Sequence, residues 1–123
     1  MNTILQEPFV ERFREANTPF LSPAKVGDFF GFRVQELAER AHVHRNTPTM
    51  RPHTPQLQKC LQDMVRVLAV ATEMTGDPDR AAFLLRNEPL RVFGYKTADA
   101  LIQEGRADAV VAYLESLAGG AAG

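Results

Sequence analysis

The stretch PQLQKCLQDMVRVLAVATEMTG, residues 55–76, decides the fold. Pro55 suits the first turn of a helix, and Gly76 is typical of a helix C-terminus. Val67, Val70 and Met74 add apolar surface beyond one face, so this helix should lie at the centre of a core or in a dimer seam. The main stripe, spaced three or four residues apart, is Leu57, Cys60, Leu61, Met64, Val65, Leu68, Ala71 and Thr72.

Three further helices are predicted after this stretch, over residues 77–88, 98–105 and 106–120. The connector LRVFGYK, residues 90–96, is irregular and needs a turn at Gly94. The helix ends are predicted from residues with strong terminal preferences: Asp77, Pro78, Pro89, Thr97, Gly105, Gly119 and Gly120.

Shorter helices are also predicted before residue 55. EPFVERFREAN, residues 7–17, can form a first helix. Ser22 and Pro23 start a second helix, which Gly31 ends, and residues 33–43 form a third. Residues 46–55 hold three prolines and are predicted to be an ordered linker. No strand pair is evident, so the sequence predicts an all-α fold.

SPAKVGDFFGFRVQELAER, residues 22–40, has the layout of a helix-turn-helix. Small Gly27 lets the second helix approach, and Gly31 makes the turn. A plain helical hairpin fits the same spacing, and Glu36 and Glu39 would repel phosphate. The residues expected to face DNA are Arg33, Gln35, Arg40, His44, Arg45, Asn46 and Arg51.

Composition excludes several classes of function. The net charge of -1 gives no overall attraction to nucleic acid, so DNA binding requires a local patch. The single cysteine excludes an intrachain disulfide and suits a reducing compartment. The N-terminal residues lack a signal-peptide pattern, and no apolar stretch approaches a membrane span. We therefore expect a cytoplasmic protein without membrane contact.

No constellation of catalytic residues is evident. His42, His44 and His53 sit at a predicted helix end and in a loop, where surface or capping roles are commoner than zinc ligation. Cys60 lies on the buried stripe, where cysteine is usually a packing residue. We predict no catalytic residue, no metal and no cofactor. A helical enzyme using His44 or His53 is the third hypothesis, after the two given below.

Three motifs in the last third resemble the toxin-binding domain of Xre/MbcA/ParS-type antitoxins: TGDPDRA (75–81), NEPLRVFGYKTADALIQEG (87–105) and ADAVVAYLESLAGG (107–120). LAERAHVHRNT, residues 37–47, resembles the Xre-type N-terminal half of those proteins. The resemblance implies a helix-turn-helix half joined by a long helix to a small toxin-binding domain. The expected divisions are an N-terminal helix or extension (1–20), a helix-turn-helix-like region with a proline-rich linker (21–54) and a helical dimerisation and toxin-binding domain (55–123).

The resemblance also implies a function. Such antitoxins pair with RES-domain toxins, which destroy NAD; they dimerise, and their C-terminal segment lies at the entrance to the NAD pocket. The N-terminal half often binds the promoter of the operon. The expected toxin-binding residues are Arg106, Tyr113, Leu117, Ala118, Gly119, Gly120, Ala121, Ala122 and Gly123.

Two interpretations of the C-terminal third stay open at this point. The small side chains of AGGAAG, residues 118–123, can enter a narrow pocket, whereas a glycine-rich end is more often a frayed tail. The alternative function is a stand-alone helix-turn-helix regulator of transcription whose C-terminal helices serve only for dimerisation.

Overall fold

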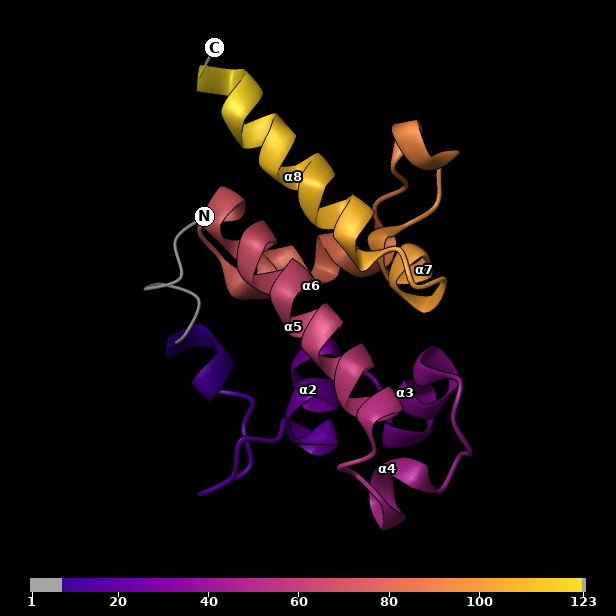
Figure 1. Cartoon of the computed structure of the whole chain (residues 1–123). Helices are drawn as coiled ribbons and strands as arrows, with labels where there is room; N and C mark the ends of the chain where they lie inside the picture. The colour runs from indigo at the N-terminus through magenta and orange to yellow at the C-terminus, as the bar shows by residue number, and fades with distance from the viewer. Residues whose placement is uncertain (1–7, 123) are drawn as a thin grey trace. The chain divides into compact units, whose positions relative to one another are not determined.

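The computed structural model describes residues 8–122, and Figure 1 shows its helices in chain order. The chain divides between Val65 and Arg66 into two compact units. Residues 8–122 hold helices, turns and two isolated β-bridges, with no strand among them. The predicted all-α fold is confirmed. None of the described helices combines the length and the hydropathy that crossing a bilayer requires.

The first unit contains a helical turn at residues 8–11, then α2 (Pro23–Phe30), α3 (Val34–Ala41), α4 (Thr47–Met50) and the beginning of α5. As predicted, Ser22 caps α2, because its Oγ accepts a hydrogen bond from the Lys25 backbone N–H at 3.1 Å. Gly31 ends α2 in the left-handed conformation, with φ 80°.

Close packing of α2 on α3 depends on Gly27, as the sequence predicts. A Cβ atom at Gly27 would lie 2.7 Å from the Phe32 carbonyl oxygen and 3.4 Å from Leu37. Val26, Phe32 and Leu37 are buried in this contact. The space that a side chain at position 27 would need is therefore occupied by the backbone of the following turn.

The linker prediction for residues 46–55 is wrong at α4. Thr47–Met50 form a short helix that packs against α3, and Pro48 is buried in its first turn. Proline is compatible with this position because the first N–H groups of a helix have no partner within the helix. A proline count alone therefore overestimates irregular structure here.

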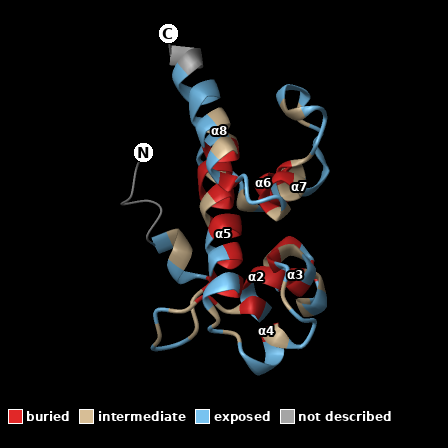
Figure 2. Ribbon diagram, turned by 45° about the vertical axis from the view of Figure 1, so that its right-hand side comes forward, coloured by how far each residue is buried: buried red, intermediate tan, exposed pale blue. Residues whose placement is uncertain are grey.

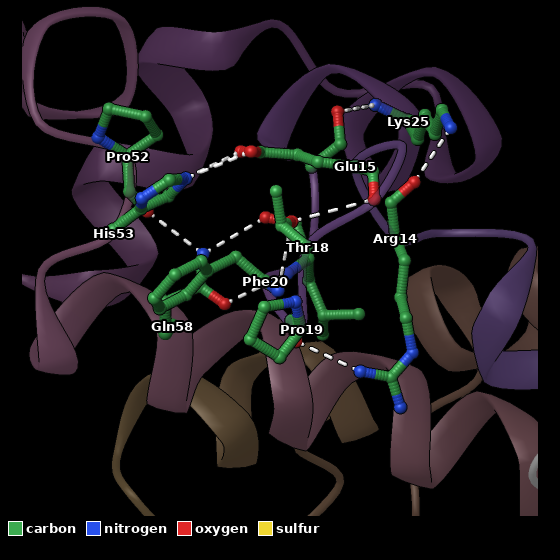
Figure 3. Close-up of polar contacts among 11 residues, drawn as sticks. Arg14, Glu15, Thr18, Pro19, Phe20, Lys25, Pro52, His53 and Gln58 are labelled. Atoms are coloured by element: carbon green, nitrogen blue, oxygen red, sulfur yellow. Dashed lines mark hydrogen bonds and ion pairs between the residues drawn. The ribbon is translucent and has the colours of Figure 1, made fainter.

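The segment before α2 is fixed to the start of α5 by side chains (Figure 3). Gln58 is only 5% exposed, and its Oε1 accepts from the Leu21 N–H at 2.9 Å. Its Nε2 donates to the carbonyl oxygens of Leu21 at 2.9 Å and Pro52 at 2.8 Å. The His53 ring stacks on Phe20 at 3.9 Å between centroids. One buried amide thus satisfies three backbone groups.

The long helix α5 runs from Pro55 to Thr75, one residue short of the predicted stop at Gly76, which has φ 75°. Figure 2 shows buried positions along much of its length. Val67 and Val70, which widen the apolar stripe, are buried within the single chain, while Met74 is partly exposed. A central position in the fold therefore accounts for the extra apolar side. A dimer seam is thus not needed to cover Val67 and Val70, and dimerisation itself stays a prediction.

The second unit contains the end of α5, then α6 (Pro78–Asn87), the 3-10 turn η1 (Arg91–Phe93), α7 (Ala98–Gln103) and α8 (Ala107–Ala122). Its predicted caps are confirmed. The Asp77 side chain accepts from the Asp79 and Arg80 N–H groups, and Thr97 Oγ1 accepts from the Ala100 N–H at 3.1 Å. The core residues come from all three helices: Ala81, Leu85, Leu101, Ile102 and Val110.

The predicted end of the last helix at Gly119 and Gly120 is wrong. Helix α8 continues through both glycines to Ala122. Gly119 has an ordinary helical backbone, unlike Gly76 and Gly105, which adopt positive φ. Glycine permits a left-handed stop but does not impose one, and inside a helix it costs only about 1 kcal/mol relative to alanine.

Candidate functional site

Two of the residues singled out in the second unit, Arg106 and Tyr113, lie around one aromatic ring, that of Phe93. The Arg106 guanidinium carbon is 5.3 Å from the Phe93 ring centroid. The Phe93 and Tyr113 rings meet edge to face, with centroids 5.6 Å apart and planes at 83°. Sequence reasoning missed Phe93, and its only signal is an aromatic residue beside the turn glycine Gly94.

The connector 90–96 that carries Phe93 is a closed loop. The Leu90 N–H donates to the Lys96 carbonyl at 2.8 Å, and the Tyr95 N–H donates to the Leu90 carbonyl at 2.9 Å. Glu104 lies beside its second end, where Lys96 Nζ contacts one carboxylate oxygen at 2.6 Å and Arg106 lies 3.8 Å from the other. The predicted turn at Gly94 is confirmed, with φ 67°.

An apolar cavity of about 150 Å³ opens beside Tyr113. Leu117 and Met74 are among its lining residues and are partly exposed, so the cavity reaches the surface. Glu88 is the one charged residue of its lining among the described residues. The arrangement suits the binding of an apolar side chain. The complete lining is Ala71, Met74, Thr75, Leu84, Leu85, Glu88, Leu90, Ala98, Val110, Tyr113, Leu114 and Leu117.

The end of α8 is an exposed helix with few charges. Its first turns are held by the buried Val110 and Val111 and by an ion pair between Arg66 and Asp108. Residues 115–119 are exposed (Figure 2), and Glu115 is the one charged residue between positions 109 and 122. The candidates Leu117, Ala118, Gly119, Gly120, Ala121 and Ala122 are thus in a helix and not in a frayed tail, while Gly123 lies outside the described residues.

Three of the candidate DNA-binding residues line one hollow in the first unit. Arg33, Gln35 and Arg45 surround it together with Glu39, and its volume is about 360 Å³. Arg40 instead stacks on the Phe32 ring, with its guanidinium carbon 3.7 Å from the centroid. The other three candidates are exposed near α4: His44, Asn46 and Arg51.

Acidic groups beside this hollow weaken any interaction with phosphate. The Glu36 carboxylate accepts a hydrogen bond from the Arg33 backbone N–H at 2.9 Å at the start of α3. That bond, and to a smaller extent the Arg33 side chain, lowers the pKa of Glu36 and so stabilises the charged form of its carboxyl group. An anionic ligand of this hollow must therefore be held by its arginines against two nearby carboxylates, Glu36 and Glu39.

The residues considered for chemistry have structural surroundings. His53 Nε2 lies 2.9 Å from Glu15 Oε1, and His44 Nδ1 accepts from the Asn46 N–H at 3.1 Å. Cys60 is buried. Within residues 8–122, no cluster of three or more His, Cys, Asp or Glu side chains is arranged to hold a metal ion.

Comparison with protein families finds a match for the C-terminal part of the chain. Residues 70–120 match the model of the antitoxin Xre/MbcA/ParS C-terminal toxin-binding domain. The match begins in the last turns of α5 and ends in α8, so it includes the loop 90–96, Arg106 and Tyr113. The resemblance of this part of the sequence is confirmed. No significant match was found among curated proteins or solved structures.

Proposed function

Because residues 70–120 are a toxin-binding domain of the Xre/MbcA/ParS antitoxin family, we propose that the chain is the antitoxin of a type II toxin–antitoxin pair. Its proposed partner is a RES-domain toxin that degrades NAD. The observation that carries this proposal is the end of α8, residues 115–122, which holds a single charged residue and is exposed from Glu115 to Gly119. Exposed helices of this kind are suited to lie in an apolar groove of a second protein.

In this proposal α8 acts by obstruction. Its base is fixed by buried Val110 and by α7, which packs against it, so its end has a defined direction. Eight residues of helix reach about 12 Å at 1.5 Å per residue. Alanine and glycine keep the last turn slender, which lets it enter the mouth of a narrow pocket and exclude NAD. The chain itself carries out no chemistry.

The test is a chain truncated after Ala118, compared with full-length Gly119→Ala as a control that keeps the length of the helix. The truncation removes only glycine and alanine from the end of the chain, so the free energy of unfolding should change by less than about 1 kcal/mol. A pull-down should show that the truncated chain still binds the toxin through the rest of the domain. NAD consumption by that complex should resume, whereas the Gly119→Ala complex stays inhibited.

The contrary result is a truncated chain that binds and still inhibits fully. Inhibition would then come from the helices that cover the toxin, and the end of α8 would not block the pocket. Loss of both binding and inhibition would instead make the end of α8 a main source of affinity.

Repression of its own promoter is a second part of the proposal. The first unit supports it through the hollow between Arg33 and Arg45 and through its charge. Residues 8–65 hold eight Lys and Arg against six Asp and Glu, while residues 66–122 hold six against eight. A stand-alone regulator would have the same excess of basic residues in its first unit. A gene for a RES-domain toxin beside this one would therefore favour the antitoxin over the stand-alone regulator.

A homodimer completes the proposal, on the basis of the family resemblance. Light scattering on the purified chain measures it directly, because the monomer mass is 13.7 kDa. A mass of one chain at micromolar concentration contradicts it.

A further inference from the structure

We infer that the loop 90–96 is a second contact surface for the toxin, distinct from the end of α8, and that it inserts Val92 and Tyr95 into an apolar hollow of the toxin edged by carboxylates. This inference rests on the proposed toxin–antitoxin function and adds to it the position and chemistry of a contact. Four features of the loop carry it: exposure, backbone strain, rigidity and charge.

The loop presents two large apolar side chains to solvent. Val92 is 64% exposed and Tyr95 is 65% exposed, although the same seven residues bring Phe93 against Tyr113. The loop therefore has one ring turned to its own domain and two side chains turned away from it. Tyrosine is among the residues most enriched at binding hot spots.

Tyr95 is held in a backbone conformation that a tyrosine resists. Its φ is 67°, directly after Gly94 at the same φ. A left-handed conformation costs a non-glycine residue about 1–2 kcal/mol. Glycine or asparagine would form the same turn at a smaller cost. Because the ring is exposed, its contacts within the chain offset little of that cost. We therefore expect contact of the ring with a second molecule to offset the rest.

The loop is rigid before any partner arrives. Two backbone hydrogen bonds from Leu90 and Tyr95 close it, Lys96 is paired with Glu104, and Phe93 is held between Tyr113 and Arg106. A surface that is already ordered loses little conformational entropy on binding, so more of its contact energy appears as affinity.

The charge of the loop predicts the charge of the toxin surface that it contacts. Arg91, Lys96 and Arg106 lie on or beside the loop, with Glu104 as the acidic group paired to two of them. This concentrates positive charge on a unit that otherwise has an excess of carboxylates. A complementary surface therefore carries acidic groups around an apolar hollow. The loop adjoins the middle of α8, because Tyr113 contacts Phe93, and Tyr113 lines the same cavity as Leu117, so one partner can reach both surfaces.

The experiment measures the dissociation constants of full-length Tyr95→Gly and Val92→Ser for a purified RES-domain toxin that the wild-type chain is proposed to bind. Tyr95→Gly should bind at least about tenfold more weakly than the wild type, as expected for the loss of a hot-spot side chain. Val92→Ser should also bind more weakly, because it loses apolar contact area. Tyr95→Gly relieves the positive φ, so its unfolding midpoint in urea should be equal to or higher than that of the wild type. This separates a lost contact from a damaged fold.

Phe83→Ser is the matched control, because Phe83 is 63% exposed on α6 in the same unit. It should bind the toxin like the wild type. Wild-type affinity in both loop variants overturns the inference and leaves the proposed function intact. An equal loss in Phe83→Ser also overturns it, since the contact would then not be specific to the loop. A wild-type chain that does not bind the toxin overturns the proposed function and the inference together.

Discussion

At the scale of single residues, the first unit depends on a side chain that imitates a backbone. Gln58 accepts from the Leu21 N–H and donates to the Leu21 carbonyl, as a neighbouring strand would, and it also donates to Pro52. A buried amide of this kind contributes mainly by leaving no backbone group unsatisfied. The segment before α2 is thereby fixed to α5 without any regular sheet.

Replacing Gln58 by leucine should therefore lower the free energy of unfolding by about 2–4 kcal/mol, because three backbone groups lose their partner at once. Gln62→Leu is the matched control, since Gln62 is exposed on the same helix. It should change stability by no more than about 0.5 kcal/mol. Urea denaturation of both variants measures the difference, and equal stabilities would show that water satisfies the Leu21 and Pro52 groups equally well.

Residue roles were predictable from sequence when the partner is local. Ser22, Asp77 and Thr97 cap helices through N–H groups two or three residues away, and each was recognisable from its position alone. Gln58 pairs with a residue 37 positions earlier, and Phe93 meets Tyr113 across a whole helix. Such contacts depend on how the helices pack, which neither periodicity nor composition specifies.

At the scale of elements, the contact between α2 and α3 is the most sensitive to a small change. Gly27→Ala places a methyl group 2.7 Å from the Phe32 carbonyl oxygen, which is backbone and cannot rotate away. Overpacking of this kind costs about 1–3 kcal/mol and outweighs the better helix propensity of alanine. We expect a lower thermal midpoint for Gly27→Ala.

Gly119→Ala makes the same chemical change in α8 with the opposite expected sign. No atom lies within 4 Å of the added methyl group, so alanine should stabilise the helix by up to about 1 kcal/mol. Thermal unfolding of the two variants side by side checks both signs. A destabilised Gly119→Ala would show that Gly119 is needed for its backbone freedom, as the sequence first suggested.

The boundaries of elements were predictable only where one signal dominates. Gly31, Gly76 and Gly105 all take positive φ beside the ends of helices, as expected of terminal glycines. Pro48 and Gly119 carry signals that are equally compatible with a helix interior or a first turn, and there the prediction was wrong. The candidate site shares this limit, because α8 was expected to end at Gly119 and Gly120 and instead continues to Ala122.

At the scale of the whole molecule, charge is divided unevenly along the chain. The first unit has an excess of basic residues and the second an excess of acidic ones, although the whole chain is close to neutral. Net charge alone therefore hides a possible DNA-binding surface. Attraction to phosphate has to come from few arginines, since Glu36 and Glu39 lie beside the hollow that Arg33 and Arg45 line.

The combined variant Arg33→Ala, Arg45→Ala and Arg51→Ala should accordingly abolish promoter binding and leave toxin binding unchanged. Each phosphate contact contributes about 0.9 to the slope of log affinity against log salt, so any residual binding should show a slope smaller by about three. Replacing the same three residues by lysine keeps their charge and should retain most of the slope. Fluorescence anisotropy with a promoter duplex across a salt series measures both variants, and a pull-down with the toxin shows that the fold is intact. Promoter affinity that survives the alanine substitutions would place the DNA-binding surface elsewhere, because alanine at these three positions can no longer contact a phosphate.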